Sequence, residues 1–262
     1  MRANNRKVKF EEMIPSELQA IIQGVSIVFL PVGSMEWHGP HMGMGMDTIN
    51  AYAVALGAAR RLGGAVMPPL YIGTESLRSP ETLRKIGFDG NEDIIGMDFP
   101  KNSIRSMYWP EDLFRAVIRQ NICCLLSMGF RTVAVINGHG ADNQVTALQD
   151  IGSEISTQTG SQVIPMFILY EECGVSIGHA GLAETSVMLA LAPEGVEISA
   201  LPLKPEKLKN VDYAIVDNET FTLGGNRDFT VRYDPRDATA KMGFDILAYE
   251  INRCVTTLID KL

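Results

Sequence analysis

The sequence alternates short apolar runs, bounded by Gly or Pro, with longer stretches whose apolar residues recur at helical spacing. This alternation constrains the fold more than any other feature, because it is typical of βα units that build a parallel sheet covered by helices. We expect strands at residues 25–32, 65–72, 132–136 and 163–170. We expect helices at residues 47–62, 110–129, 142–155, 183–191 and 238–259. The sequence therefore predicts an α/β fold, and we treat residues 1–262 as one domain.

Two stretches do not follow this alternation. Residues 74–108 are irregular, rich in Gly, Pro, Ser and Met, and longer than ordinary connections between strands and helices. We expect them to form a functional loop or lid. Residues 201–233 are expected to be a small excursion from the sheet, and neither stretch contains an informative motif.

The charge balance limits the partners that the protein can bind. Lys and Arg number 23 against 31 Asp and Glu, which gives a net charge of -8. An acidic chain of this kind disfavours a nucleic-acid surface, so a small-molecule or peptide partner fits better, and we expect a small-molecule substrate. The first ten residues contain no apolar stretch, and the most apolar helical stretch, residues 114–128, is too short and too charged to span a bilayer. We expect a cytoplasmic protein without a membrane partner.

The histidines are the first indication of chemistry. All four lie in three short Gly-rich segments, at places where predicted strands end or predicted helices begin: His38, His41, His139 and His179. In open α/β sheets, ligands bind beyond the carboxyl ends of the strands. The placement of the histidines therefore favours a functional site over satisfied core or surface positions.

The first segment, residues 31–47, reads Pro-Val-Gly-Ser-Met-Glu-Trp-His-Gly-Pro-His-Met-Gly-Met-Gly-Met-Asp. Glu36 and His38 are two residues apart, so on extended backbone they point to the same side. The glycines allow the chain to return Asp47 toward them, which gives two carboxylates and an imidazole able to bridge two divalent ions. The alternative is that Asp47 caps the following helix and that Glu36 lies on a solvated face.

The second and third segments follow later predicted strands. Asn137-Gly-His139-Gly places an imidazole directly after a buried strand, and Asn137 is able to hold a neighbouring loop by hydrogen bonds. Asp142 is a better candidate for a helix N-cap than for a ligand. Gly-His179-Ala-Gly-Leu-Ala-Glu184-Thr-Ser places a histidine before a helix, and Glu184 fits a capping or dipole role there as well as a role in the site.

These three segments, in this order and spacing, resemble the creatininase (creatinine amidohydrolase) family. The resemblance runs from about residue 28 to residue 193, with weaker echoes at residues 99–106 and at Asp234-Pro-Arg236. It implies a three-layer α/β/α domain with a mainly parallel sheet and a binuclear divalent metal centre. It also implies a homo-oligomer, often a hexamer. The Met-rich stretch at residues 42–46 supports an oligomer too, since it would be an unusual apolar surface to leave in water.

The resemblance also assigns roles to residues of the three segments. By motif, Glu36, Asp47 and His139 resemble the ligands of one metal. His38 and Asp47 resemble the ligands of the other, so that Asp47 bridges the two ions. His179 matches the family's proton-transfer histidine.

The chain departs from creatininase itself at two places. Creatininase has an acidic ligand two residues after the histidine of the Asn-Gly-His element, where this chain has Ala141. We therefore assign Glu184 to the vacant place at the second metal, which makes it part of the catalytic centre. A Trp-Asp pair of creatininase corresponds to Val175 and Ser176 here, which argues against creatinine as the substrate.

The chemistry follows from the centre. Two divalent ions a few ångströms apart lower the pKa of a bridging water toward about 7, supply hydroxide at neutral pH and polarise a carbonyl. His179 would carry the proton to the leaving group. The oxygen and nitrogen ligands suit Zn, Mn and Fe.

Three functions remain open. The first hypothesis is hydrolysis of a cyclic or linear amide C–N bond. The runner-up is ring-opening hydrolysis of a cyclic diketone, such as 3-dehydro-scyllo-inosose in inositol breakdown. The third is a non-catalytic paralogue that binds a ligand, which would require an eroded ligand set.

Overall fold

A parallel sheet forms the centre of the molecule. The computed structural model describes residues 7–168, 178–211, 214–215 and 234–262. In these ranges the sheet has the order β2-β1-β4-β5, with β3 also paired to β1, and every pairing in it is parallel. The strands are β1 (Ile27–Gly33), β2 (Ala65–Val66), β3 (Leu70–Tyr71), β4 (Thr132–Asn137) and β5 (Gln162–Phe167).

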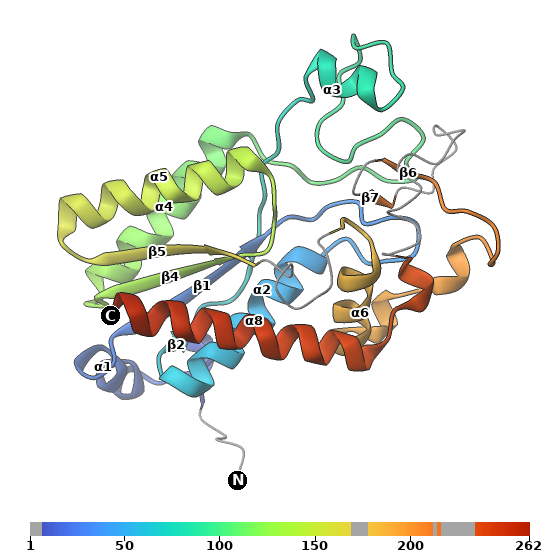
Figure 1. The fold of residues 1–262 in the computed structure, drawn as a ribbon. Helices are drawn as coiled ribbons and strands as arrows, with labels where there is room; N and C mark the ends of the chain where they lie inside the picture. Colours follow the sequence, from blue (N-terminus) through green and yellow to red (C-terminus); the bar gives the residue numbers. More distant parts are fainter. Residues whose placement is uncertain (1–6, 169–177, 212–213, 216–233) are drawn as a thin grey trace.

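Helices cover both faces of this sheet (Figure 1). The helices are α1 (Pro15–Gln23), α2 (Met46–Leu62), α3 (Pro80–Lys85), α4 (Glu111–Ser127), α5 (Asp142–Thr159), α6 (Leu182–Leu191) and α8 (Ala240–Lys261). Helices α4 and α5 lie on one face, and α2 and α8 lie on the other, where α6 packs against α8. Short 3-10 turns complete the described ranges at Phe10–Glu12, Pro193–Gly195, Ile198–Ala200 and Pro235–Asp237.

The alternation of side chains along β1 explains the layers. Ile27 and Phe29 belong to the hydrophobic core shared with α2, α6 and α8. Val28 and Leu30 belong to the core shared with α4 and α5. A strand buried on both faces needs an unbroken apolar run, which is what residues 27–32 supply. The predicted three-layer α/β/α fold with a mainly parallel sheet is therefore confirmed.

The strand expected at residues 65–72 is wrong as a single element. It is divided into β2 and β3, and the sequence between them contains Pro68 and Pro69. Proline has no backbone N–H and does not continue a ladder in the middle of a sheet. Helices α1 and α3 were not expected from the sequence. The remaining strand and helix predictions agree with the structure to within a few residues, although residues 169–170 of the last expected strand lie outside the described residues.

The irregular stretch 74–108 is anchored at several points. Backbone bridges join Gly73 to Tyr108 and Leu77 to Ile95. Helix α3 lies within this stretch, and a small hydrophobic core packs it against Trp37 and the rest of the stretch. The buried residues of this core are Trp37, Leu83, Ile94, Met97 and Phe99. In the stretch 201–233, β6 (Asn210–Val211) and β7 (Ala214–Ile215) form a two-stranded antiparallel ribbon, and residues 212–213 and 216–233 lie outside the description. The role of residues 74–108 as a lid stays a prediction.

The Met-rich stretch is mostly buried in the chain. Met42 is 7% exposed and Met46 is 1% exposed, because both pack into the core beside α6. This stretch therefore gives no separate argument for an oligomer, because Met42 and Met46 are buried within the chain and Met44 is half-buried. The oligomer stays a prediction that rests on the family resemblance alone.

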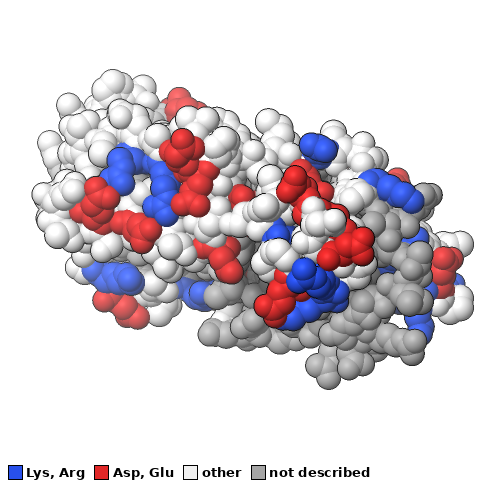
Figure 2. Space-filling model, turned by 90° about the horizontal axis from the view of Figure 1, so that it is seen from above, with Lys and Arg blue, Asp and Glu red and all other residues white. Residues whose placement is uncertain are grey.

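The surface charge is mixed where it is visible. On the face drawn in Figure 2, acidic and basic side chains are interspersed. Arg115 and Arg119 of α4 pair with Asp150 and Glu154 of α5, which neutralises part of the charge carried by these two helices. Among the described residues, no helix is both long enough and apolar enough to cross a membrane.

Candidate metal centre

The carboxyl ends of β1 and β4 meet the start of α2. Val32 of β1 is paired with Asn137 of β4, so the segments that follow these two strands begin side by side. Gly138 makes the approach possible, because a Cβ built on it would lie 2.0 Å from the carbonyl oxygen of Asp47. Only glycine permits backbone at that separation, and His139 is consequently placed against the first turn of α2.

We call Glu36, Asp47 and His139 the deep set. The Nδ1 atom of His139 lies 3.0 Å from Asp47 Oδ2 and 3.1 Å from Glu36 Oε2. All three side chains are buried. Two further side chains fix the carboxylates: the Ser34 hydroxyl donates to Asp47 Oδ2 at 2.6 Å, and the Tyr108 hydroxyl donates to Glu36 Oε1.

We call His38, Asp47 and Glu184 the α6-side set. The Nε2 atom of His38 lies 3.2 Å from Asp47 Oδ1 and 3.8 Å from Glu184 Oε2. The Nδ1 atom of His38 donates to the backbone carbonyl of Glu36 at 2.9 Å, which fixes the ring with Nε2 facing the carboxylates. Asp47 thus presents Oδ2 to the deep set and Oδ1 to the α6-side set.

The electrostatics of the deep set favour added positive charge. Burial alone would raise the pKa of Glu36, but the charges of His139 and His179 lower it to about 2. Burial would lower the pKa of His139, yet Glu36 and Asp47 raise it well above its usual value. The buried carboxylates therefore stay ionised and attract whatever cation reaches them.

The same balance holds for the α6-side set. Burial lowers the pKa of His38, but the charge of Asp47 and its hydrogen bond raise the value to about 10. Burial would raise the pKa of Asp47, and the charge of His38 holds it well below its usual value. Protonated imidazoles thus neutralise the carboxylates where divalent cations would do so equally well. The ligand atoms of each set lie within 4.8 Å of one another, and a carboxylate and imidazole donor set fits Zn, Mn or Fe.

The contacts of Glu184 are compatible with both roles considered for it, the support of a helix start and membership of the site. Its Oε2 atom accepts a hydrogen bond from the backbone N–H of Ala180 at 2.5 Å, just before the first turn of α6. Ala180 has a positive φ of 56°, so this bond supports a strained turn. Burial raises the pKa of Glu184 to about 7. Its carboxylate therefore stabilises local backbone and also belongs to the α6-side set.

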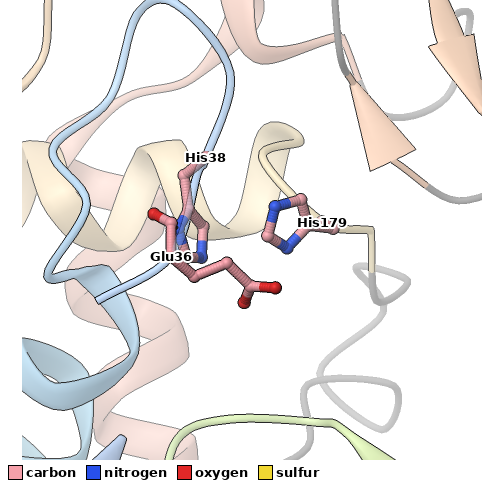
Figure 3. A group of neighbouring side chains, drawn as sticks. All are labelled: Glu36, His38 and His179. Atoms are coloured by element: carbon pink, nitrogen blue, oxygen red, sulfur yellow. The ribbon is translucent and has the colours of Figure 1, made fainter. Parts of the chain in front are cut away.

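The ring of His179 lies beside the ring of His38. The two ring centroids are 4.3 Å apart, and Figure 3 shows the His179 ring facing His38 and the Glu36 side chain. The Nε2 atom of His179 donates to the backbone carbonyl of Trp37 at 2.6 Å. Burial and the charge of His38 lower the pKa of His179 to about 4. The ring is therefore neutral at pH 7, with Nδ1 as an acceptor.

Three sequence interpretations of neighbouring residues need correction. Asp47 is not the N-cap of α2, because Gly45 holds that position and the Asp47 side chain faces the histidines. Asp142 is not an N-cap either: Ala141 occupies the N-cap position of α5 without a side-chain hydrogen bond, and Asp142 belongs to neither donor set. The fourth histidine, His41, is buried and bonded through Nε2 to Thr185 at 3.0 Å, outside both sets.

Asn137 holds the site more directly than expected. Its side chain donates to the carbonyl of His139 at 2.7 Å and accepts from the N–H of the same residue at 3.1 Å. Gln144, which the sequence analysis missed, extends this network. Its Nε2 donates to Asn137 Oδ1 at 2.8 Å, and its Oε1 accepts from Thr74 N–H at 2.8 Å. The loop that bears His139 is therefore tied to the start of residues 74–108.

Both donor sets face a cavity of about 570 Å³. Glu36, Asp47, His139, His179 and Glu184 line one part of it, and residues between 75 and 97 line another. Sequence reasoning missed Ser34 and Tyr108 among the polar contacts, although Ser34 stands within the first motif. Val175 and Ser176, which argued against creatinine, lie outside the described residues.

A three-layer α/β/α fold with two carboxylate and imidazole sets that share one aspartate defines a protein with a candidate binuclear metal centre. The family model of creatininase, described as creatinine amidohydrolase, matches residues 11–258. The chain therefore belongs to the creatininase family.

Individual relatives agree with this assignment. The chain is 27% identical over 213 residues to a creatinine amidohydrolase of Pseudomonas putida, covering 74% of this chain and 75% of the relative. A zinc–zinc form of a mutant creatininase has a TM-score of 0.68 at 23% identity, over 98% of both chains. A manganese creatininase has a TM-score of 0.67 at 25% identity, over 98% of this chain and 99% of the other.

Proposed function

We propose that the protein is a metal-dependent hydrolase that cleaves a cyclic or linear amide C–N bond of a small molecule. The observation that carries this proposal is that Asp47 offers one oxygen to each of two donor sets beside one cavity. Two divalent ions bound there would lower the pKa of a shared water and polarise the substrate carbonyl.

The residues of the two donor sets would form two metal-ion positions. Glu36, Asp47 and His139 would hold one ion, and His38, Asp47 and Glu184 would hold the other. The burial of these side chains supports this assignment, because buried carboxylates need either protonated imidazoles or cations beside them. Zinc and manganese forms of related creatininases support the choice of metals.

In this proposal, His179 moves the proton. Its Nε2–H is committed to the carbonyl of Trp37, so Nδ1 is the atom that accepts a proton and then returns it to the leaving nitrogen. The neighbouring His38 is held by the carbonyl of Glu36, with its ring beside that of His179. Creatinine is not the expected substrate, because Val175 and Ser176 stand where creatininase has its Trp-Asp pair.

The test combines metal analysis with a substrate screen. We expect purified protein to contain up to two divalent ions per chain, and metal-loaded protein to hydrolyse compounds among a panel of lactams and formamides. Turnover of cyclic polyol ketones alone would favour the ring-opening alternative. Full activity of metal-free protein would contradict the proposed mechanism, and bound metal without turnover of any of these classes would favour a ligand-binding paralogue.

A further inference from the structure

One cationic side chain lines the cavity among the described residues. Arg78 comes from the stretch 74–108, and the other described lining residues are acidic or neutral apart from the two histidines. The acidic lining residues include Glu75 and Asp142 in addition to the donor sets. A positively charged side chain beside so many carboxylates suggests that Arg78 has a specific role in the cavity.

The guanidinium of Arg78 is held in place without a carboxylate. Its Nε donates to the carbonyl of Gly96 at 2.6 Å, and its Nη2 donates to the sulfur of Met97 at 3.4 Å. Its Cζ lies 5.1 Å from the ring centroid of Phe99. Within the described ranges, no carboxylate lies within ion-pair distance of Arg78, and Nη1 has no hydrogen-bond partner.

The nearby Glu75 is not paired with this charge. One of its oxygens accepts from the backbone N–H of Ser76 at 2.6 Å, and no ion pair joins it to Arg78. Burial raises the pKa of Glu75, while the nearby charge of Arg78 lowers it without forming an ion pair. Arg78 therefore presents an oriented fork of N–H donors to the cavity with no carboxylate at ion-pair distance among the described residues, a geometry that matches a carboxylate of a ligand.

We propose that the substrate of this centre carries a carboxylate that binds Arg78, while its scissile carbonyl lies at the Asp47 end of the same cavity. The inference rests on the proposed hydrolase function and narrows its substrate class to amides with an acidic group. A carboxylate fits better than a phosphate, because the acidic lining residues repel a doubly charged group more strongly than a singly charged one.

The test uses pairs of probes that differ only in charge. Succinamic, glutaramic and adipamic acids each contain one amide and one carboxylate, and their diamides are the neutral counterparts. Calorimetry measures their binding to zinc-loaded protein and to chelator-treated protein. The second form separates binding at Arg78 from direct binding to a metal ion. The three chain lengths report the spacing between Arg78 and the centre.

Arg78→Gln should lower the affinity for the best amido acid by roughly tenfold or more and leave the diamide unchanged, because it removes a charge-assisted pair. Arg78→Lys should lose less, since it keeps the charge without the fork. Arg84→Gln is the matched control, because Arg84 lies on α3 in the same stretch, is exposed and does not line the cavity. Circular dichroism of each variant checks that it is folded. If Arg78→Gln is misfolded, the comparison of acids with diamides in wild-type protein and in Arg78→Lys decides the matter.

The outcomes separate this inference from the proposed function. Equal binding of acids and diamides by wild-type protein, equal losses for Arg78→Gln and Arg84→Gln, or no binding of the acids in the millimolar range would overturn the role of Arg78. Hydrolysis of neutral amides could still stand in that case. Conversely, the protein could bind an amido acid through Arg78 and yet contain no metal and show no turnover. That result would support the role of Arg78 in binding a carboxylate and refute the proposed hydrolase function.

Discussion

The two donor sets share Asp47 but differ in how firmly the rest of the molecule fixes them. In the deep set, Ser34 and Tyr108 each bond a carboxylate, and the three members come from segments at β1, β4 and α2. In the α6-side set, Glu184 lies 3.8 Å from His38 and also serves the backbone of Ala180. The deep set is therefore preorganised, whereas the α6-side set depends on Glu184, whose carboxylate also accepts a hydrogen bond from the backbone of Ala180.

This difference implies unequal affinities for the two ions. A site whose ligands are already oriented loses less conformational freedom on binding. The deep set should fill first and release its ion last. The α6-side set should bind more weakly, because the pKa values of His38 and Glu184 are raised to about 10 and about 7 and both must lose a proton before they ligate, whereas in the deep set only His139 must do so.

The largest effect is expected from Asp47→Asn, which removes the shared charge and so erases the difference between the sets. Both ions should be lost or greatly weakened, and turnover should fall by more than about a hundredfold, the scale seen when second-shell partners alone are removed. Metal analysis and steady-state rates measure this. Asp142→Asn is the matched control, since Asp142 lines the same cavity outside both sets. Retention of two ions by Asp47→Asn would refute the shared ligand.

A smaller and selective effect is expected from Glu184→Gln, which keeps shape and hydrogen-bonding capacity. If Glu184 is a ligand, the protein should keep one ion, lose the second, and slow by orders of magnitude, since both ions are needed to activate water at neutral pH. If it serves only Ala180, stability should fall by about 0.3–1 kcal/mol while both ions remain. Metal titration and thermal unfolding distinguish these results. His179→Asn is the comparison variant, because loss of a proton acceptor should slow turnover while both ions stay bound.

The sequence predicted the deep set better than its surroundings. Glu36, Asp47 and His139 stand in Gly-rich motifs after apolar runs, and the end of a parallel strand is where such side chains converge. The position of β4 beside β1, which brings two of these segments together, comes only from the structure. Local sequence signals therefore indicated that these residues belong to a site, and the family resemblance grouped the three into one set.

Apart from Ser34, which stands within the first motif, the residues that the sequence did not reveal act across long separations along the chain. Tyr108 reaches Glu36 from the end of an irregular stretch, and Gln144 joins Asn137 to Thr74 from within α5. No periodicity or motif marks a side chain whose partner is set by tertiary packing. The capping interpretations of Asp47 and Asp142 were wrong for a related reason. Propensity favours an acidic residue near a helix start, and tertiary contacts decide which position it takes.

The smallest effect is expected from Tyr108→Phe, which tests whether the outer hydrogen bonds account for the firmness of the deep set. Burial and the charge of Glu36 raise the pKa of Tyr108 well above its usual value, so its hydroxyl stays protonated and donates to Glu36 at neutral pH. Without this donor, Glu36 keeps its charge but loses one restraint. The affinity of the deep set for its ion should fall about tenfold, the lower end of the range for such partners, with the stoichiometry unchanged.

Tyr71→Phe is the control for this change, since Tyr71 is 39% exposed and does not line the cavity. Competition with a metal-sensitive dye measures the affinity of each ion separately, and the ratio of the two affinities is the decisive quantity. Tyr108→Phe should lower the deep-set affinity and bring it closer to that of the α6-side set. If both affinities fall equally, the hydroxyl supports the whole cavity wall rather than Glu36, and the contrast between the two sets has another cause. If neither changes, the fixed positions of β1 and β4 alone preorganise the deep set.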